Sequence, residues 1–428
     1  MPGSKLPSRP DRAPRRSRLT NSPSPRIGYL TSSYARPSDT FIRNEVNQLR
    51  KLGVDVATFS IRRPTVGADV EDDVRRHQDA TEYLLEAGIG SIVSRAVWQA
   101  AAHPLSFLRT ARLAWRSSAP GLRGVLLQAA YLVEALYLAS LLRQRKIELL
   151  HNHIGENSAT VAMLAAEFSG IPFSLTIHGP YIFYAPQRWA LATKLARAAF
   201  TACISQFCRS QCFVFAPESA WPRMHIVRCS VQPEFIDSPP NQGFPAEPHF
   251  VCVGRLCAEK GQALLLEAAA QLLGAGHRLR VSLVGDGPHR QSLEQLIRAA
   301  NIQERVTILG WQSSEQIREL LLQSTALVIP SFAEGLPIVA LESLAMRRPV
   351  IATNIAAMSE LIENEQSGWL IPPSSVEHLA DAMKAVIECP PAKLQTMGET
   401  GRQRVLELHH PVRQAEQLQS LFSDAVER

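Results

Sequence analysis

The chain lacks an uninterrupted apolar run of the length that a membrane-spanning helix needs, about 18 residues. Its first 25 residues are rich in arginine, proline and serine and contain no apolar segment typical of a secretory signal. Cysteine is scarce, with seven in 428 residues. An odd number without a secretory signal favours reduced thiols over disulfides. We therefore expect a cytoplasmic protein in which residues 1–25 form a disordered basic tail.

Acidic residues are nearly absent from two segments that carry most of the positive charge. Residues 1–26 hold seven Lys and Arg against Asp11, and residues 94–146 hold eight against Glu134. Because the whole chain has a net charge of only +6, the remainder is acidic. Such a local excess does not indicate nucleic-acid binding. It favours contact of the second segment with an anionic surface such as phospholipid headgroups; an insertion that simply packs on its own domain is the alternative.

Strand-like and helix-like segments alternate in two series, and the length of the chain also suits two domains. Strands are predicted at 26–31, 54–59, 147–151, 173–177 and 201–204, and then at 250–253, 280–284, 306–309, 325–329 and 350–352. A helical, basic insertion is predicted at about 78–146, and prolines between 233 and 248 separate the two series. We expect an α/β protein with two doubly wound, Rossmann-like domains, 26–235 and 236–408, that face a central cleft. Residues 409–428 are expected to form a helix that packs back toward the first domain.

The strand at 250–253 leads into Gly-Arg-Leu-Cys-Ala-Glu-Lys-Gly, from Gly254 to Gly261. Gly254 permits a tight exit from the strand, and Gly261 permits a close backbone approach. Arg255 and Lys260 place two cations near the N-terminus of the next predicted helix, whose free N–H groups favour an anion. This pattern predicts a diphosphate clamp, against the alternative of a solvated basic loop.

A second glycine turn, Gly285-Asp286-Gly287, follows the strand that ends at residue 284. A strand, a glycine turn and a helix direct backbone N–H groups toward the same cleft. The sequence does not continue as the dinucleotide pattern G-x-G-x-x-G, and no acidic residue follows at the required spacing. A Rossmann dehydrogenase is therefore disfavoured.

Two carboxylates flank a turn in Glu334-Gly335-Leu336-Pro337 and the segment that runs on to Glu342. The apolar run at 325–329 precedes them, and proline in the first turn would start a helix that carries Glu342. Open parallel sheets bind ligands at the carboxyl ends of their strands, so both carboxylates are candidates for a ligand site. The alternative is a solvated pair on a surface loop.

In the first domain, His178 follows the strand at 173–177 and precedes Gly179. An imidazole in this position is a candidate for a hydrogen bond to a sugar hydroxyl or for proton transfer, or else it is a buried core histidine. His151 and His153 end another strand, but no third metal ligand is suitably spaced, so we expect no metal site.

Two further groups have weaker signals. Ser38, Asp39 and Thr40 open the helix after the first strand, where they either cap the helix or contact a phosphate or acceptor across the cleft. Cys203, Cys208 and Cys212 are expected to be buried thiols, because no histidine or aspartate joins them.

Together these motifs resemble the retaining, GT-B-fold glycosyltransferases of family 4, over nearly all of residues 26–408. The most specific parts are the 254–261 loop and the two glutamates eight positions apart. Similarity to the bacterial exopolysaccharide and colanic-acid type rests on the segments at 37–45, 151–155, 176–179 and 203–207. The resemblance implies a nucleotide-sugar donor (a UDP- or GDP-sugar), a saccharide or lipid-linked acceptor, no metal or organic cofactor, and a location in the cytoplasm or on the inner membrane face.

The resemblance also implies roles for individual residues. Arg255 and Lys260 would hold the donor diphosphate, and Glu342 would hydrogen-bond the ribose. Glu334 and the amides of Gly335 and Leu336 would lie beside the transferred sugar. His178 would lie near the reacting carbon, and residues 310–312 would line the base pocket.

The chain departs from the family pattern at two places. Pro180 and Tyr181 stand where an acidic residue usually follows the His-Gly pair, and Ser230-Val231-Gln232 replaces the usual Gly-Val-Asp. These changes affect the acceptor side and the hinge more than the donor side. A nucleotide-sugar epimerase, a phosphorylase, or a non-catalytic binding subunit of a polysaccharide assembly complex remain alternative functions.

Overall fold

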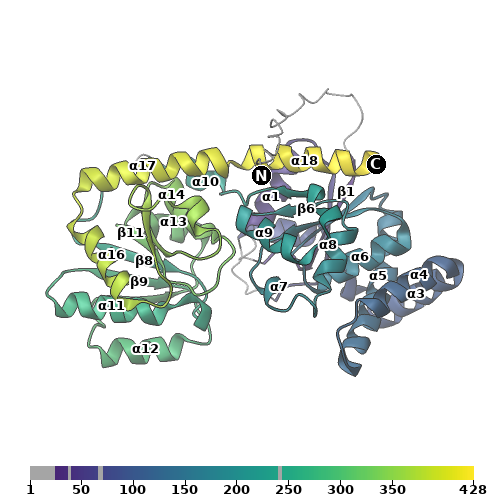
Figure 1. Ribbon diagram of the computed structural model, residues 1–428, viewed down its shortest axis with the longest axis horizontal. Helices are drawn as coiled ribbons and strands as arrows, with labels where there is room; N and C mark the ends of the chain where they lie inside the picture. The colour runs from purple at the N-terminus through teal and green to yellow at the C-terminus, as the bar shows by residue number, and fades with distance from the viewer. Residues whose placement is uncertain (1–24, 37–39, 66–70, 240–242) are drawn as a thin grey trace, which may run out of the picture.

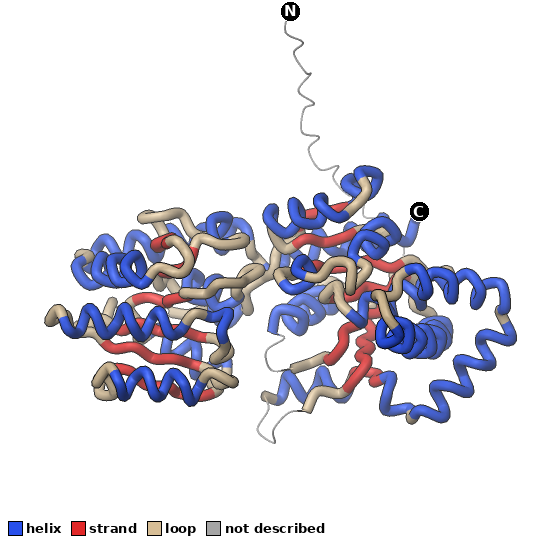
Figure 2. The backbone as a smooth tube through the Cα atoms, turned by 60° about the horizontal axis from the view of Figure 1, so that its bottom comes forward, coloured by secondary structure: helices blue, strands red, loops and turns tan. Residues whose placement is uncertain are grey.

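The computed structural model describes residues 25–36, 40–65, 71–239 and 243–428. It consists of two α/β lobes side by side, and helices α17 (Pro391–Leu408) and α18 (Pro411–Glu427) run along one edge of both (Figure 1). Each lobe contains one parallel sheet between layers of helices (Figure 2). The predicted fold class, two doubly wound α/β domains, is therefore confirmed. The predicted basic tail lies outside the described residues.

The first sheet has seven parallel strands in the order β3-β2-β1-β4-β5-β6-β7. These are β1 (Ile27–Ser33), β2 (Val56–Arg62), β3 (Thr81–Tyr83), β4 (Leu149–His153), β5 (Phe173–Ile177), β6 (Thr201–Cys203) and β7 (Met224–Ile226). Its α-helices are α1 (Thr40–Lys51), α2 (Asp72–Asp79), α3 (Ile89–Ala102), α4 (Pro104–Arg116), α5 (Leu122–Gln144), α6 (Asn157–Ser169), α7 (Tyr181–Tyr184), α8 (Leu191–Arg197) and α9 (Gln206–Phe215). The short helix α10 (Pro233–Ile236) follows and packs on the second domain.

The second sheet has six parallel strands in the order β10-β9-β8-β11-β12-β13. These are β8 (His249–Val253), β9 (Arg280–Val284), β10 (Val306–Gly310), β11 (Ala326–Ile329), β12 (Val350–Thr353) and β13 (Gly368–Ile371). Its remaining α-helices are α11 (Gln262–Gly274), α12 (Arg290–Ala299), α13 (Ser314–Leu322), α14 (Ile338–Ala345), α15 (Met358–Leu361) and α16 (Val376–Glu388).

The central strands are buried from end to end, because helices cover both faces of each sheet. Every residue of β4, β5, β11 and β12 is buried. This explains why these strands appear in the sequence as short continuous apolar or small-residue runs rather than as alternating patterns. In both sheets the strand order reverses beside the first strand of the domain, between β1 and β4 and between β8 and β11. Ligands of such sheets bind outside the carboxyl ends of the strands at this point.

The prediction that residues 78–146 are helical throughout was wrong at the N-terminal end of this range. Residues 81–83 form edge strand β3, which pairs with β2, and a 3₁₀ turn follows at Leu84–Ala87 before α3 begins at Ile89. The strands β3, β7 and β13 were not predicted. Each has only three or four residues, so its sequence carries too little of an apolar pattern to distinguish it from a loop.

Within the described residues, α5 is the one helix long and apolar enough, by length and composition alone, to cross a membrane. It has 23 residues, and its most apolar 18-residue stretch has a mean hydropathy of 1.8, although polar residues such as Glu134 interrupt its apolar runs. It packs against α3 and α6, and residues 135–142 lie largely in the domain core. A helix at the core of a globular domain has the same composition, so we assign α5 to the core.

The chain passes between the domains twice. It leaves the first domain after Ser230 and returns beyond His409, where α18 packs against α1. Phe422 of α18 is buried in one apolar cluster with Tyr29 and Ile42 of the first domain. The two passages contact each other, since His409 Nδ1 lies 2.7 Å from the carbonyl oxygen of Cys229.

Candidate active site

The loops that follow β8 and β11 meet, because these strands are neighbours at the point where the strand order reverses. Lys260 ends a 3₁₀ turn after β8, and Glu334 lies in the loop after β11. Lys260 Nζ donates a hydrogen bond to Glu334 Oε1 at 2.6 Å, and Ser331 Oγ donates to the same oxygen at 2.8 Å. The Glu334 side chain is only 9% exposed. Two residues that are 74 positions apart therefore form one charged, largely buried pair.

Gly261 allows these two loops to lie in contact. It has a φ of +63°, and a Cβ atom at this position would lie 2.1 Å from the carbonyl oxygen of Pro330. No other residue type fits there without displacing the backbone. The sequence predicted that this glycine serves approach to a ligand; in the structure, the close neighbour is the loop after β11.

Arg255 lies in the same loop as Lys260 and is also paired with a carboxylate. Its Nη2 donates to Glu259 Oε1 at 2.5 Å, and Tyr181 of α7 donates to the same oxygen at 2.8 Å across the domain boundary. A hydrogen bond from its own backbone N–H, together with those from Tyr181 and Arg255, lowers the pKa of Glu259 to about 2. Both cations of the predicted clamp are thus neutralised by carboxylates of the chain itself.

Glu342 lies in the second turn of α14 and is only 8% exposed. Burial raises the pKa of its carboxyl from 4.5 to about 7. Within the described part of the chain, no side chain or backbone group forms a hydrogen bond or ion pair with this carboxylate. A buried carboxylate without a partner is costly to the fold and is typical of a group that a ligand satisfies.

The glycine turn at 285–287 is joined to the clamp loop by backbone hydrogen bonds. Leu256 N donates to Asp286 O at 3.0 Å, and Gly285 N donates to Gly310 O at 2.8 Å. The loops that follow β8, β9 and β10 therefore lie in a row. Next to them Trp311 is 66% exposed, so its ring is accessible to a stacking partner.

The loop between Glu334 and α14 contacts the first domain directly. A Cβ atom on Gly335 would lie 2.1 Å from the carbonyl oxygen of His178, so glycine is required for this contact. Leu336 beside it is buried. The structure thus brings Lys260, Glu334 and the His178 loop to one boundary between the domains.

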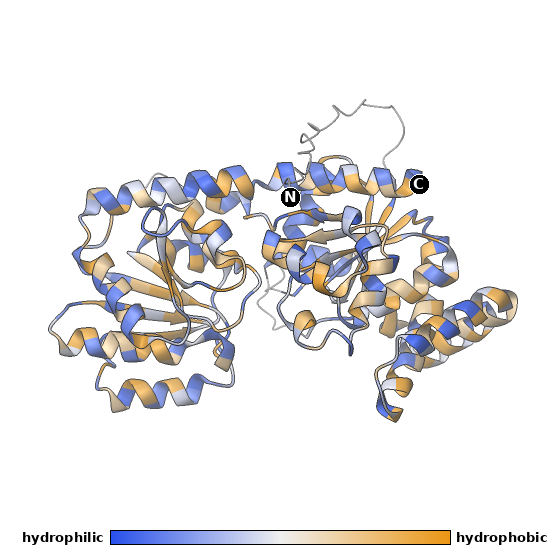
Figure 3. Ribbon diagram, in the orientation of Figure 1, coloured by the Kyte–Doolittle hydropathy of each residue, from blue (hydrophilic) through white to orange (hydrophobic). Residues whose placement is uncertain are grey.

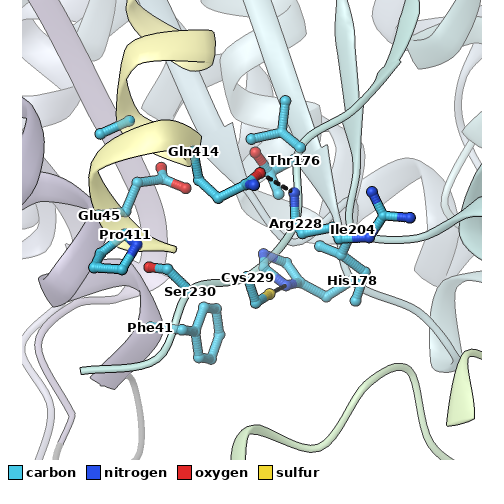
Figure 4. A pocket seen from close by; sticks show the side chains of 12 residues that line it. Phe41, Glu45, Thr176, His178, Ile204, Arg228, Cys229, Ser230, Pro411 and Gln414 are labelled. Carbon is cyan, nitrogen blue, oxygen red and sulfur yellow. Dashed lines mark hydrogen bonds between the residues drawn. The ribbon is translucent and has the colours of Figure 1, made fainter. Parts of the chain in front are cut away.

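His178 is the outer member of a largely buried series of hydrogen-bonded polar groups, and Figure 4 shows it with two of the others, Glu45 and Cys229. Glu45 Oε1 accepts from Tyr29 Oη at 2.7 Å and lies 2.9 Å from His153 Nε2. His153 Nδ1 lies 3.0 Å from His178 Nε2, and His178 Nδ1 lies 3.7 Å from Cys229 Sγ. If both imidazoles are neutral, the carboxylate of Glu45 fixes the direction of every hydrogen bond in this series, because an ionised carboxylate can only accept hydrogen bonds. His153 then donates to Glu45, and His178 donates to His153.

The surroundings of His178 favour the neutral form of its imidazole. Burial, with the nearby His153, lowers the pKa of His178 to about 3. Burial alone would raise the pKa of Glu45, but its contacts with His153 and Tyr29 lower it overall. Both ring nitrogens of His178 are engaged by the protein, so a contact between one of them and a sugar requires the ring to turn. The predicted role of His178 at the sugar stays a prediction.

Sequence reasoning did not assign a role to Glu45, Cys229 or Glu259. Glu45 was part of a recognised segment, but a lone carboxylate on a helix carries no local signal that it faces a histidine 108 positions away. Of the predicted loop residues, Ser38 and Asp39 lie outside the described residues, and Thr40 begins α1.

Among the residues that the structure describes, two groups have ligand atoms near enough to one another to hold a metal ion. One is Cys203, Cys208 and Cys212, and the other is Glu45, His151 and His153. Both nitrogens of His151 are already close to hydroxyls, at 2.7 Å from Ser174 and 2.9 Å from Thr176. The three thiols are buried as predicted. Neither group touches the clamp.

Comparisons with known proteins identify the second domain. Residues 236–404 match the family model described as Glycosyl transferases group 1. The second domain is therefore a group 1 glycosyltransferase domain, and the whole molecule has the fold of GT-B glycosyltransferases. The matched range contains every predicted donor-side residue, from Gly254 to Glu342.

This glycosyltransferase is similar to several curated bacterial enzymes. It is 27% identical over 84% of its length to the putative teichuronic acid biosynthesis glycosyltransferase TuaC of Bacillus subtilis, of which the match spans 88%. It is 38% identical to the alpha-D-kanosaminyltransferase of Streptomyces kanamyceticus and 29% identical to the putative colanic acid biosynthesis glycosyltransferase WcaL of Escherichia coli, but these matches span only 38% and 41% of the respective enzymes.

Two solved structures share the fold of the whole molecule. Sucrose-phosphate synthase from Thermosynechococcus elongatus superposes with a TM-score of 0.70 and 18% identity, covering 94% of this chain and 98% of that one. Anabaena HepE, solved in complex with UDP-glucose, superposes with a TM-score of 0.69 and 16% identity, covering 93% and 99%.

Proposed function

We propose that this enzyme transfers a sugar, with retention of the anomeric configuration, from a nucleotide-sugar to a lipid-linked saccharide in the synthesis of a bacterial cell-surface polysaccharide. The names of TuaC and WcaL support the pathway class, and the HepE complex with UDP-glucose supports a uridine nucleotide as donor. Free thiols at all seven cysteines agree with a cytoplasmic enzyme or one on the inner membrane face.

The observation that carries the proposal is the buried carboxylate of Glu342, which has no partner among the described residues and lies on the helix that follows Glu334, the partner of Lys260. The ribose hydroxyls of a nucleotide supply the hydrogen-bond donors that Glu342 lacks. The diphosphate supplies negative charge for Arg255 and Lys260, and it replaces Glu259 and Glu334 as their partners. Trp311, whose ring is exposed, would stack on the base.

The chemistry follows from the distribution of charge. As the bond between the anomeric carbon and the diphosphate oxygen breaks, positive charge grows on the sugar and negative charge grows on the leaving diphosphate. Arg255, Lys260 and the loop amides stabilise the leaving group, while Glu334, released from Lys260, faces the sugar. The acceptor hydroxyl attacks from the face that the diphosphate leaves and gives its proton to the departing phosphate oxygen. This step needs neither a metal ion nor an organic cofactor.

The function is tested by measuring the thermal stability of the purified protein with UDP, GDP and ADP and their sugars. We expect stabilisation by one nucleotide class, and loss of that stabilisation in Lys260→Ala. A charge-assisted contact of this kind is worth about 1.5–3 kcal/mol, or roughly a tenfold to hundredfold loss of affinity. Lys384→Ala, which removes an exposed lysine of α16, is the matched control and should bind as the wild type does.

The second readout is transfer from the bound donor to isolated lipid-linked saccharides. A protein that ignores all nucleotides would contradict the proposal. Binding without transfer would favour a non-catalytic binding subunit, and interconversion of donor sugars without an acceptor would favour an epimerase.

A further inference from the structure

Helices α3, α4 and α5 form a three-helix projection from the first domain, with α3 and α4 at its outer end (Figure 1). Ten of the nineteen large hydrophobic side chains that are exposed in the described part of the chain fall within residues 89–127. A folded domain seldom exposes so many together unless they have a partner. Polar and apolar residues are interspersed along these helices rather than separated into two halves (Figure 3).

The exposed apolar residues recur at helical spacing. On α3, Ile89, Val93 and Val97 are four positions apart, so they share one face, and Trp98 lies beside them. On α4, Leu105, Leu108 and Trp115 are three and seven positions apart, which also places them on one helix face. Trp98 is 61% exposed and Trp115 is 69% exposed.

The charges of the same segment have a single sign. Residues 89–127 contain five arginines and no aspartate or glutamate. Within the described residues, none of these arginines forms an ion pair; Arg95 and Arg109 donate only to serine hydroxyls, at 3.3 and 3.4 Å. Unpaired arginines beside exposed tryptophan and leucine suit the interface of an anionic bilayer, where the apolar atoms enter the acyl boundary and the guanidinium groups bind lipid phosphates.

A groove of the first domain lies beside this surface, at the end of α4. It has a volume of about 240 Å³ and is lined by the end of α4 at Arg116, by the segment before α8 at Pro186 and Gln187, and by Phe215. Tyr184, which is 66% exposed, ends α7 just before that segment, and Tyr181 of the same helix reaches Glu259 in the second domain. Helix α7 therefore joins the segment that lines this groove to a contact with the second domain.

We propose that α3, α4 and the first turn of α5 dock this enzyme on the anionic headgroups of a bilayer and so present a lipid-linked acceptor to the cleft. This inference deepens the proposed function and depends on it for the nature of the acceptor. The docking itself depends only on the surface, and it is measured without any turnover.

The test is co-sedimentation of the full-length protein with vesicles rich in phosphatidylglycerol, compared with vesicles of pure phosphatidylcholine. We expect binding only to the anionic vesicles, and loss of that binding at high salt. Each basic residue near such a surface contributes about fivefold in affinity, so Arg109→Gln with Arg112→Gln and Arg116→Gln should weaken binding by roughly 100-fold. Trp98→Ser with Trp115→Ser should weaken it at least about tenfold.

Two control variants change the same residue types elsewhere. Val214→Ser removes a hydrophobic side chain that is 70% exposed on α9, and Arg298→Gln removes an exposed arginine on α12 of the second domain. Both should bind vesicles as the wild type does. All variants should keep their nucleotide-induced thermal stabilisation, which separates a failure of docking from a failure of the proposed donor site.

Three results would overturn the inference. The first is a wild-type protein that does not pellet with anionic vesicles, or whose pelleting neither set of substitutions changes. The second is a dimer in sedimentation velocity that the tryptophan substitutions dissociate, since this surface would then be covered by a second copy. The third is membrane association that survives an alkaline carbonate wash, which would favour insertion of α5 across the bilayer.

Discussion

A single carboxyl group, that of Glu342, links the stability of this enzyme to its substrate. Burial raises its pKa from 4.5 to about 7, so between these values the folded protein binds a proton that the unfolded chain has released. The free energy of unfolding therefore falls as pH rises through this window. The shift corresponds to about 3 kcal/mol above pH 7, an upper estimate for one group.

Donor binding should have the opposite pH dependence. A ribose diol donates to the ionised carboxylate, so binding competes with protonation of Glu342. We expect the affinity of the wild type for its nucleotide-sugar to fall by up to about tenfold per pH unit below pH 7, as measured by calorimetry. Glu342→Gln should bind weakly at every pH and should be more stable than the wild type at pH 8. An affinity of the wild type that is constant from pH 5.5 to 8 would show that Glu342 does not contact the donor.

At the scale of secondary-structure elements, the clamp loop after β8 carries its own competing anion. Glu259 holds Arg255 and also accepts from Tyr181 of the facing domain. A donor diphosphate has to displace this carboxylate from the guanidinium group before Arg255 can bind it. The free enzyme is therefore held in a self-paired arrangement that the donor replaces.

Removing the competing carboxylate from this loop is predicted to increase its affinity for the nucleotide-sugar donor. Glu259→Gln removes the competing charge while keeping the size of the side chain, so it should tighten donor binding by about threefold to tenfold. The measurement is a titration of the nucleotide-sugar at low and high salt. Glu294→Gln, which removes a carboxylate from an ion pair on α12, is the matched control. Weaker donor binding in Glu259→Gln would instead indicate that Glu259 helps to build the site.

Elements also set the limit of what could be predicted from sequence. The clamp and the 334–342 segment were predictable, because a strand, a glycine turn and a helix with polar residues at fixed positions form a local pattern. The contact between Glu45, His153 and His178 could not be predicted from the sequence, because it depends on β1, β4 and β5 being neighbours in the sheet. Alternation of strands and helices predicts a parallel sheet, but it does not give the order of the strands.

At the scale of the whole molecule, Glu360 connects the two domains on the far side of the His178 loop. This residue of α15 accepts hydrogen bonds from the backbone N–H groups of Gln206 and Phe207, at 2.9 and 2.8 Å. These groups are the free donors at the N-terminus of α9 in the first domain, and Arg228 lies nearby at 3.5 Å. A carboxylate at a helix N-terminus contributes up to about 2 kcal/mol, so this contact stabilises the observed contact between the domains.

Removing that carboxylate should open the molecule. Glu360→Ala is expected to increase the radius of gyration in small-angle scattering without donor, with little loss of secondary structure. Glu388→Ala, on the exposed face of α16, serves as the control. An unchanged scattering curve in Glu360→Ala would show that the other contacts between the domains suffice.

The contact between His409 and Cys229 O determines which domain motions are easy. Two separate passages of the polypeptide, bonded to each other, behave as a pair of adjacent pivots. Rotation about the line through them is then the least costly rearrangement, whereas sliding of one lobe along the other would stretch one passage or break the bond. A chain shortened before Pro411 would retain one pivot only, and its lobes would gain a twisting freedom that the intact enzyme does not have.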